Sequence, residues 1–515
     1  MAEAATDSDQ DRSAAGSHSI WLVAIVVSMA TFMEVLDTSI ANVSLQHIAG
    51  SLAASQDEST WVLTSYLVSN AIILPISGWL SRAVGRKRFY MICVAVFGTS
   101  SLLCGLAPSL NWLIFFRVLQ GLGGGGLAPS EQSILADTFP LKLRGQAFAL
   151  YGIAVVVAPT LGPTLGGWIT DSFSWRWIFL INVPVCVGSL IVSGIILNDP
   201  PAVQRDHQEA LAAGSRIDYL GFVLVAVGLG CMQVVLDKGQ EDDWFHSNFI
   251  LAFSIVSALS LAFLIVWELN QEEPIVDLPL ARNPNFGAAM IVMFVTGFIL
   301  ISTTQMLPQF LQVMMGYNAT KAGLALTAGG AATLLMMPLV GALLRKIQPK
   351  YLIMFGLTLE ALACWYFQGF DLGVSFSHVA FGRVIQGLGL PFLFVPITTA
   401  SYAGLPPGKS NNASALINTM RNLGGSWGIS IAVMILARRS QFHHSRLGES
   451  LSVFSPVYAA GRRMGASAHA LMLTQQANLL SYLDAFHFLA LVSILAVPIT
   501  FILRRAKGGE AAEAH

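Results

Sequence analysis

The sequence predicts an all-α membrane protein built from two pseudo-symmetric six-helix bundles and two inserted helices. Three observations support this fold class: the apolar composition, the number of long apolar stretches and an internal repeat. Of the 515 residues, 54% are hydrophobic and only 11% are charged, whereas a soluble globular chain carries roughly 25% charged residues. The mean hydropathy is +0.64. Because the apolar content extends along the whole chain, we expect a polytopic protein surrounded by a lipid bilayer.

Fourteen stretches are long enough to span that bilayer, since a helix needs about 20 apolar residues to cross the hydrocarbon. The predicted spans are 20–45, 60–80, 89–108, 112–135, 145–169, 177–197, 217–236, 249–267, 287–309, 320–344, 351–370, 379–400, 413–436 and 485–503. Seventeen of the 28 Lys and Arg residues fall in the segments that share a side with the N-terminus, and eight fall on the other side. Basic residues favour the cytoplasmic side, so both termini are predicted to be cytoplasmic.

An internal repeat divides the spans into two sets of six. Residues 116–123 in the fourth span return almost unchanged as residues 382–389, in the fourth span of the last six. Residues 78–82, after the second span, are similarly paralleled by residues 341–345, after the tenth. Two related bundles around a central cavity are the layout of alternating-access transporters.

The repeat and the loop lengths together predict the domain organisation. The predicted parts are a cytoplasmic N-terminal tail (1–19), an N-terminal six-helix bundle (20–197), a linker with two extra transmembrane helices (198–286), a C-terminal six-helix bundle (287–503) that includes a long periplasmic loop (437–484), and a cytoplasmic tail (504–515).

The sequence contains no motif that predicts an enzyme active site. The five cysteines form no CxxC pair, which argues against a metal site or a disulfide framework. Residues 403–410 come nearest to a phosphate-binding loop, but the leading glycine is misplaced and no strand precedes it. The net charge of −1 and the lack of a long basic stretch exclude nucleic acid as an expected partner. We therefore expect no enzyme activity, no cofactor and no metal.

Charged residues inside the spans are the strongest functional signal, because each costs about 2.5–3.5 kcal/mol on insertion scales. Glu34 and Asp37 lie three residues apart on one face of the first span. The fourth span contains Arg117 near its outer end and Glu131 nearer the cytoplasm. Asp37 and Arg117 are predicted to meet at similar depth. Burial favours a protonated carboxyl and an arginine favours its charged form, so these four residues are predicted to couple transport to protons.

A static ion pair that holds two helices together is the alternative interpretation of Asp37 and Arg117. The second-half motif contains Arg383, Gln386 and Gly387. Because this motif repeats that of the fourth span, a structural role shared by both halves is an equal alternative for the two arginines. Glu360 and Arg421, in the eleventh and thirteenth spans, are weaker candidates for a function.

Glycine and proline residues mark the fifth predicted span. The fifth span contains Pro159, Gly162, Pro163, Gly166 and Gly167. Proline bends a helix by removing backbone hydrogen bonds, and small residues allow a neighbouring backbone to approach. The span is therefore predicted to be bent and tightly packed.

Four segments together resemble one known family. They are residues 36–43 in the first span, 117–123 in the fourth, 162–167 in the fifth and 175–184 before the sixth. They resemble the signatures of the fourteen-span drug:proton antiporters of the major facilitator superfamily, and most closely those of EmrB-type exporters. Within that resemblance, residues 117–123 are similar to a motif associated with proton coupling. Residues 162–167 are similar to the motif that marks antiporters rather than symporters.

The loop after the second span also resembles the superfamily. Gly78, Gly85, Arg86 and Lys87 fit its gating motif, but Arg82 stands where the superfamily usually has an acid. The resemblance therefore implies a gating role for Gly78, Gly85, Arg86 and Lys87 and for Gly162, Pro163, Gly166 and Gly167.

The resemblance implies a multidrug efflux antiporter of the bacterial inner membrane, which exports hydrophobic, drug-like compounds in exchange for protons. It also implies a periplasmic membrane-fusion adaptor and a TolC-type outer-membrane channel, with the outer loop 437–484 as the expected adaptor contact. A proton-coupled importer of a small nutrient or ion with the same fold is the alternative. A membrane enzyme or gated pore is a third, more distant alternative, because the sequence shows no clustered nucleophile, metal set or repeated polar ring.

Overall fold

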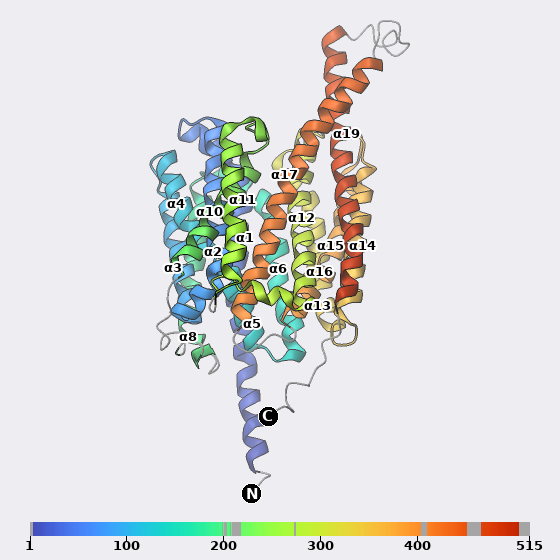
Figure 1. Cartoon of the computed structure of the whole chain (residues 1–515). Helices are drawn as coiled ribbons and strands as arrows, with labels where there is room; N and C mark the ends of the chain where they lie inside the picture. Colours follow the sequence, from blue (N-terminus) through green and yellow to red (C-terminus); the bar gives the residue numbers. More distant parts are fainter. Residues whose placement is uncertain are drawn as a thin grey trace.

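The computed structural model describes residues 4–197, 199, 203–205, 208, 218–271, 274–402, 409–450 and 465–503. All the regular elements in these residues are helices (Figure 1). This confirms the all-α class. We call residues 20–197 the N-terminal half and residues 287–503 the C-terminal half. Helices α1 and α19 respectively begin and end at the same end of the molecule, which we call the terminus end (Figure 1).

The N-terminal half contains eight helical segments. They are α1 (Ala4–Ser51), α2 (Gln56–Val84), α3 (Arg86–Gly105), α4 (Leu110–Gly124), α5 (Leu127–Thr138), α6 (Leu141–Ser172), α7 (Trp177–Leu180) and α8 (Asn182–Ile196). The inserted helices follow as α10 (Tyr219–Lys238), η1 (Trp244–His246), α11 (Asn248–Glu268) and η2 (Leu278–Arg282).

The C-terminal half repeats this succession of long and broken helices. Its elements are α12 (Pro284–Val313), α13 (Ala319–Leu343), α14 (Pro349–Gln368), α15 (Phe376–Gly389), α16 (Pro391–Ser401), α17 (Ser410–Ser450), α19 (Gly465–Ala496) and η4 (Val497–Ile502).

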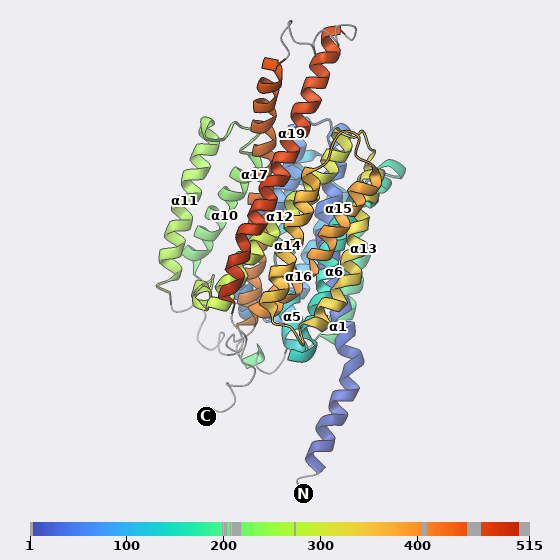
Figure 2. The ribbon, with the colours of Figure 1, turned by 90° about the vertical axis from the view of Figure 1, so that its right-hand side faces the viewer.

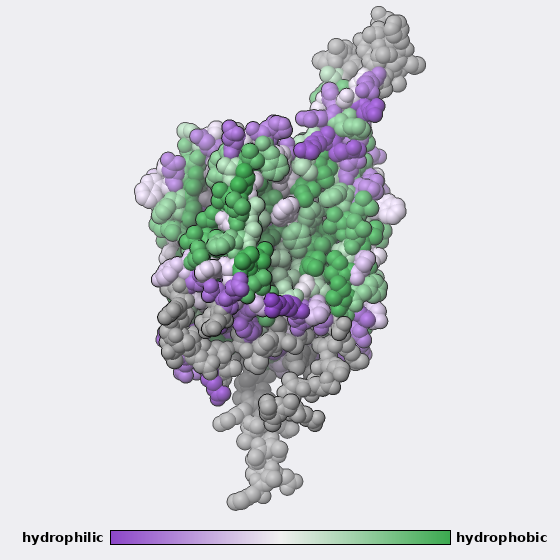
Figure 3. Space-filling view, viewed as in Figure 1, coloured by the Kyte–Doolittle hydropathy of each residue, from purple (hydrophilic) through white to green (hydrophobic). Residues whose placement is uncertain are grey.

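Within the described residues, eleven helices are long and apolar enough to cross a membrane, and twelve if the bent pair in α6 counts as one span. The predicted spans outside this set are 112–135, which is divided into α4 and α5, and 413–436, which lies in the Ser- and Asn-rich helix α17. The count of fourteen and the cytoplasmic side of the termini stay predictions. On the face seen in Figure 3, apolar side chains form a broad belt with polar residues towards both ends.

The fourth predicted span of each half is broken in the middle. In the N-terminal half the break falls at Gly125 and Gly126, where the run of glycines weakens the helix. In the C-terminal half it falls at Leu390, directly before Pro391, whose ring cannot continue an α-helix. Different residues therefore break the two pseudo-equivalent spans at similar places.

Helix α6 is bent by 46° between its two segments, Leu143–Pro159 and Leu161–Ser172. Pro163 has no backbone N–H, so the carbonyl of Pro159 lacks its usual intrahelical donor. The hydroxyl of Ser39 in α1 donates to that carbonyl over 3.1 Å. The proline is thus compensated by a side chain from the first-span motif, and the predicted bend is confirmed.

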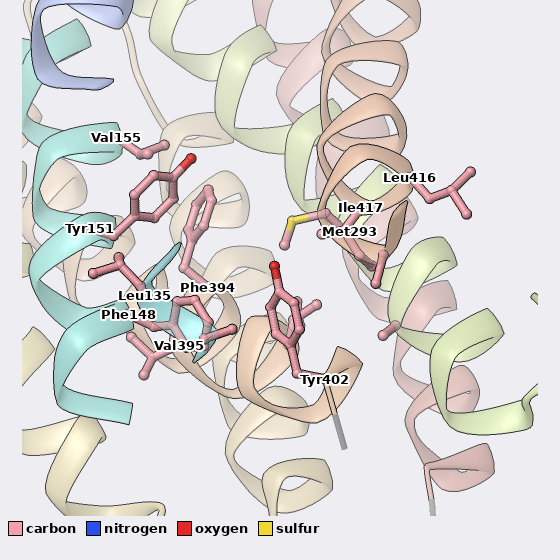
Figure 4. Close-up of a cluster of buried hydrophobic side chains, with 14 of the residues drawn as sticks. Leu135, Phe148, Tyr151, Val155, Met293, Phe394, Val395, Tyr402, Leu416 and Ile417 are labelled. Atoms are coloured by element: carbon pink, nitrogen blue, oxygen red, sulfur yellow. The ribbon is translucent and has the colours of Figure 1, made fainter. Parts of the chain in front are cut away.

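The two halves pack together at the terminus end through apolar side chains (Figure 4). Phe148 of α6 stacks on Tyr402, which follows α16, with ring centroids 5.3 Å apart and planes at 11°. Phe394 of α16, Leu135 of α5 and Met293 of α12 belong to the same buried cluster. Water is therefore excluded between the halves at this level.

Helices α17 and α19 extend well beyond the other helices at the opposite end (Figure 2). The predicted loop 437–484 is thus helical over residues 437–450 and 465–484, while residues 451–464 lie outside the described part. Charged residues made this segment look like a loop, but a helix satisfies its own backbone hydrogen bonds in water as well as in lipid. We call residues 437–450 of α17 and 465–484 of α19 the hairpin.

Candidate functional site

Asp37 lies in the middle of α1 and is only 2% exposed. Its Oδ2 accepts a hydrogen bond from Arg117 Nη1 of α4 at 2.5 Å. Its Oδ1 accepts from Gln120 Nε2 at 3.1 Å and from Asn182 Nδ2 of α8 at 2.7 Å. The predicted meeting of Asp37 and Arg117 is therefore confirmed as a buried ion pair, and three donors stabilise the charged carboxylate.

Arg117 is completely buried. Its Nε donates to the Val62 carbonyl of α2 at 3.0 Å, and its Nη1 also donates to Gln120 Oε1 at 2.8 Å. The guanidinium lies over the Tyr66 ring, 4.3 Å from the ring centroid, where the aromatic face attracts a cation. Arg117 is thus held by α2 and α4 independently of Asp37, so the carboxylate can lose its charge without releasing the arginine.

Three uncharged residues of this site were not predicted from the sequence. Ser101 Oγ of α3 accepts from Gln120 at 3.2 Å and from Asn182 at 2.9 Å, which closes a ring of polar groups around Asp37. Both amides lie inside segments that the sequence had marked, namely the repeated motif and residues 175–184. These residues were missed because only charged residues inside the spans were taken as a functional signal.

The fifth-span motif packs directly against the first-span motif. A Cβ atom on Gly162 would collide with Ser39, and one on Gly166 would lie 3.0 Å from the Ile40 side chain. Gly167 is buried beside them. The small residues of α6 therefore bring its backbone against the turn of α1 that carries Asp37, and the predicted tight packing of α6 is confirmed.

Glu34 lies one turn before Asp37, at the boundary between the two halves. Its Oε1 accepts from Asn70 Nδ2 of α2 at 3.2 Å, and Asn70 Oδ1 accepts from Asn422 Nδ2 of α17 at 3.3 Å. Arg421, the neighbour of Asn422, interacts electrostatically with Glu34. Glu34 thus connects the Asp37 helix to the C-terminal half.

Glu131 of α5 is fully buried, and a backbone hydrogen bond from Thr31 of α1 acts on its carboxyl. It interacts electrostatically with Glu34. One residue further along, Gln132 exchanges hydrogen bonds of 2.8 and 3.4 Å with Asn418 of α17. Glu131 therefore lies, like Glu34, close to the contact between the halves rather than in the Asp37 ring.

The second-half motif forms a network of its own. Arg383 Nη1 donates to Gln386 Oε1, and Nη2 donates to Thr304 Oγ1 at 3.4 Å. Gln386 Nε2 donates to Thr303 Oγ1 at 2.8 Å and to Glu360 Oε2 at 3.1 Å. A Cβ atom on Gly387 would collide with the Gly329 carbonyl of α13, so this glycine permits a close helix crossing.

The loop after α2 forms a latch at the terminus end. Gly85 has φ +93°, a region that side chains rarely adopt. It places Arg86 at the start of α3, where the buried guanidinium contacts Asp137 of α5 at 2.5 Å and Asp199 at 3.5 Å. Asp137 Oδ2 also accepts from Ser410 Oγ of α17 at 2.8 Å.

Two other residues of the gating motif contribute to this latch. Lys87 Nζ donates to the Gly194 carbonyl of α8 at 2.8 Å. A Cβ atom on Gly78 would lie 2.8 Å from Asn412 Cα, so α2 and α17 cross closely. Asp277, before η2, binds Lys409 Nζ at 2.5 Å and Asn412 Nδ2 at 3.1 Å. In this conformation the halves are closed together at the terminus end.

The sites described above are built from charged and polar side chains. Within the described part of the chain, no group of three or more His, Cys, Asp or Glu residues is arranged to hold a metal ion.

Comparisons with known proteins agree with this architecture. A family model described as Major Facilitator Superfamily matches residues 27–429. The chain is 38% identical over 457 residues to "Multidrug export protein EmrB" of Escherichia coli (strain K12), covering 88% of this chain and 87% of that protein. It is 34% identical over 494 residues to "Fatty acid resistance protein FarB" of Neisseria gonorrhoeae, covering 94% and 96%.

Among solved structures, the proton:xylose symporter XylE shares the fold with a TM-score of 0.62 at 14% identity, covering 96% of this chain and 98% of XylE. The human organic anion transporter MFSD10 gives a TM-score of 0.60 at 13% identity, covering 94% and 99%. The chain therefore belongs to the major facilitator superfamily, in the group that includes the EmrB multidrug export proteins.

Proposed function

We propose that this protein is a multidrug efflux antiporter, which exports hydrophobic toxic compounds across the bacterial inner membrane in exchange for protons. The observation that carries the proposal is the buried ion pair of Asp37 and Arg117. Sequence similarity to proteins named for multidrug export supports the substrate class. The terminus end then faces the cytoplasm, and the hairpin faces the periplasm.

In this mechanism Asp37 carries the transported proton. Protonation removes the charge that attracts Arg117, while Arg117 keeps its bonds to Val62 and Gln120. Loss of one partner from a buried ion pair costs about 3–5 kcal/mol. One inward proton releases about 2.3 kcal/mol per 100 mV and about 1.4 kcal/mol per pH unit. The energy released by one inward proton is therefore comparable to the cost of breaking the Asp37–Arg117 ion pair.

Glu34 and Glu131 act at the boundary between the halves, where the drug binds. Glu34 reaches the C-terminal half through Asn70 and Asn422, so a change in its charge alters a contact that must break when the halves rock. Glu131 is buried and belongs to none of the described ion pairs, so its carboxyl attracts a cationic substrate or a proton. Opening the latch of Arg86, Asp137 and Ser410 exposes this boundary to the cytoplasm.

The test uses acid-loaded inverted membrane vesicles that contain the protein and a pH-sensitive dye. Lipophilic cations, neutral antibiotics and weakly acidic uncouplers are added one at a time. Wild-type vesicles should release protons in response to some of these compounds, and Asp37→Asn vesicles to none, although the variant inserts normally. Export at the wild-type rate by the variant would exclude Asp37 as the proton carrier. Proton-coupled uptake of a nutrient would instead favour the importer alternative.

We further propose that the hairpin binds the periplasmic adaptor of a tripartite pump that ends in a TolC-type channel. Near the belt, Arg439 and His443 of α17 bind Asp484 of α19 at 2.5 and 2.7 Å, and Ser440 binds Asn478 at 2.5 Å. Beyond these contacts, Leu471 is 61% exposed. The helices are thus fixed at their base and expose apolar side chains towards a partner.

Deletion of residues 447–474, with a short Gly-Ser connection, leaves all the contacts at the hairpin base in place. The shortened protein should keep drug-induced proton release in vesicles but lose co-purification with the adaptor. Leu471→Asp is the milder variant and should weaken the same complex. An adaptor that co-purifies equally well with the shortened protein would show that it binds elsewhere.

A further inference from the structure

The polar networks of the two halves are related by an exchange of positions. In the N-terminal half, Gln120 donates to a carboxylate on α1 (Asp37, 3.1 Å) and to a hydroxyl on α3 (Ser101, 3.2 Å). In the C-terminal half, Gln386 donates to a carboxylate on α14 (Glu360, 3.1 Å) and to a hydroxyl on α12. Helices α1 and α12 are the first of each half, and α3 and α14 are the third. In each half, the glutamine of the repeated motif therefore binds one carboxyl group.

The surroundings of the two carboxyls differ in their positive charge. Glu360 is fully buried; its Oε2 accepts the Gln386 bond, and its Oε1 has no partner among the described residues. Arg383 of α15 and Cys364 of α14 are the charged and titratable groups that act on it. Arg383 donates to Gln386 and Thr304 instead, and the described ion pairs within 4.0 Å do not include Glu360 or Arg383.

A fully buried carboxylate that accepts one hydrogen bond and lacks an ion pair is unfavourable, because desolvation is not repaid. The neutral acid avoids that penalty. Gln386 also separates the two groups, since its carbonyl binds Arg383 and its amide binds Glu360. Movement of Arg383 past Gln386 to the carboxyl of Glu360 would favour its charged form.

We propose that Glu360 is a second proton-binding site, which is protonated in this conformation and releases its proton when Arg383 moves into ion-pair distance. The inference rests on the proposed proton antiport and adds a second proton to it. In each cycle the Glu360 carboxylate takes up one proton from the outer water, and the acid later returns that proton to the inner water. Asp37 carries the other proton independently.

The number of protons decides whether membrane potential drives export. When two protons enter for each monovalent cation that leaves, one net positive charge moves inward. A potential of 100 mV without a pH difference then supports a cation gradient of about 50-fold. When one proton enters per cation, the exchange is electroneutral, and the same potential supports no gradient.

The experiment uses the purified full-length protein in proteoliposomes, with ethidium as the monovalent cation. A potassium gradient and valinomycin set the potential, and a buffer jump sets the pH difference. Wild-type protein should accumulate ethidium with either driving force. Glu360→Gln should respond to the pH difference alone, and its limit should fall from about 100-fold to about tenfold per pH unit. Asp371→Asn, an exposed acid of the same half, is the matched control and should behave as wild type.

An undiminished response of Glu360→Gln to the potential would overturn the proposal. Failure of the wild-type protein to exchange ethidium for protons would instead count against the proposed function. An infrared measurement judges Glu360 separately, because it needs no substrate. The wild-type spectrum minus the Glu360→Gln spectrum at neutral pH should contain the carbonyl band of a protonated carboxyl, and the same difference should appear when both proteins also carry Asp37→Asn. A difference spectrum without that band would also overturn the proposal.

Discussion

The N-terminal and C-terminal halves use the same arginine–glutamine pair in two electrostatic states. In the N-terminal half, Arg117 reaches Asp37 directly at 2.5 Å, and the glutamine supports the same carboxylate. In the C-terminal half, Gln386 stands between Arg383 and Glu360, and the described contacts contain no ion pair between them. The repeated motif therefore does not decide whether its arginine forms an ion pair with the carboxyl.

This difference teaches how a duplicated fold acquires unequal sites. The frame of each half is set by a helix crossing at a glycine and by an arginine three residues before a glutamine. Moving the acid from the first helix to the third changes which group the arginine meets. The paired and unpaired sites differ in which of these helices carries the acid and which carries the hydroxyl.

The comparison is tested most severely by removing each arginine. Arg117→Ala leaves the Asp37 charge buried without its partner and should lower the free energy of unfolding by about 3–5 kcal/mol. Arg383→Ala removes only hydrogen bonds and should lower it by about 1–3 kcal/mol. Unfolding of the purified variants in detergent, followed by circular dichroism, measures both. Equal losses would contradict the assigned charge states, and adding Asp37→Asn to Arg117→Ala should recover part of the loss.

A second pair of variants tests what the halves share. A Cβ atom on Gly121 would collide with Ser69 and the Tyr66 carbonyl, and one on Gly387 would collide with the Gly329 carbonyl. Both Gly→Ala changes should therefore destabilise the protein by about 1–3 kcal/mol, because the helices must separate. Gly188→Ala, where nothing lies within 4 Å of the added atom, is the control. A tolerated Gly387→Ala with a damaging Gly121→Ala would show that the crossings are not equivalent.

The smallest effect is expected at the turns after α2 and α13. Gly85 has φ +93°, whereas Gln348, at the parallel position of the second half, has φ −65°. Gly85→Ala should cost about 1–2 kcal/mol through backbone strain, and Gln348→Ala should stay within about 0.5 kcal/mol. Thermal unfolding of both variants in the same detergent gives the comparison. Similar midpoints would mean that the first turn relaxes without strain.

Much of the fold was predictable because lipid enforces simple rules on sequence. Buried charges are rare enough in apolar spans that Asp37 and Arg117 stood out, and their depth along the helices predicted the pair. The apolar runs gave most helices to within several residues, as for 351–370 against Pro349–Gln368. Helix α17 was the exception at its outer end, since hydropathy marks where lipid stops and not where a helix stops.

The polar neighbours could not be found by the same reasoning. Ser101 and Asn182 are uncharged and belong to helices far apart in the sequence, so only the packing of α3 and α8 on α1 assembles them. Asp137 was also missed as the partner of Arg86, because that contact depends on how α3 meets α5. The assignment of a proton to Asp37 stays a prediction, as do the roles of Glu34 and Glu131.

Helix α17 runs unbroken for 41 residues, from Ser410 at the latch to the hairpin. At 1.5 Å per residue it is about 60 Å long, which is greater than the thickness of the bilayer. A stiff rod of this length converts a tilt at one end into a displacement at the other. Opening or closing of the latch at Asp137 would therefore shift the hairpin, and a protein bound to the hairpin would in turn favour one state of the latch. Helix α17 alone can thus couple the conformation of the membrane-spanning part to a protein bound outside it.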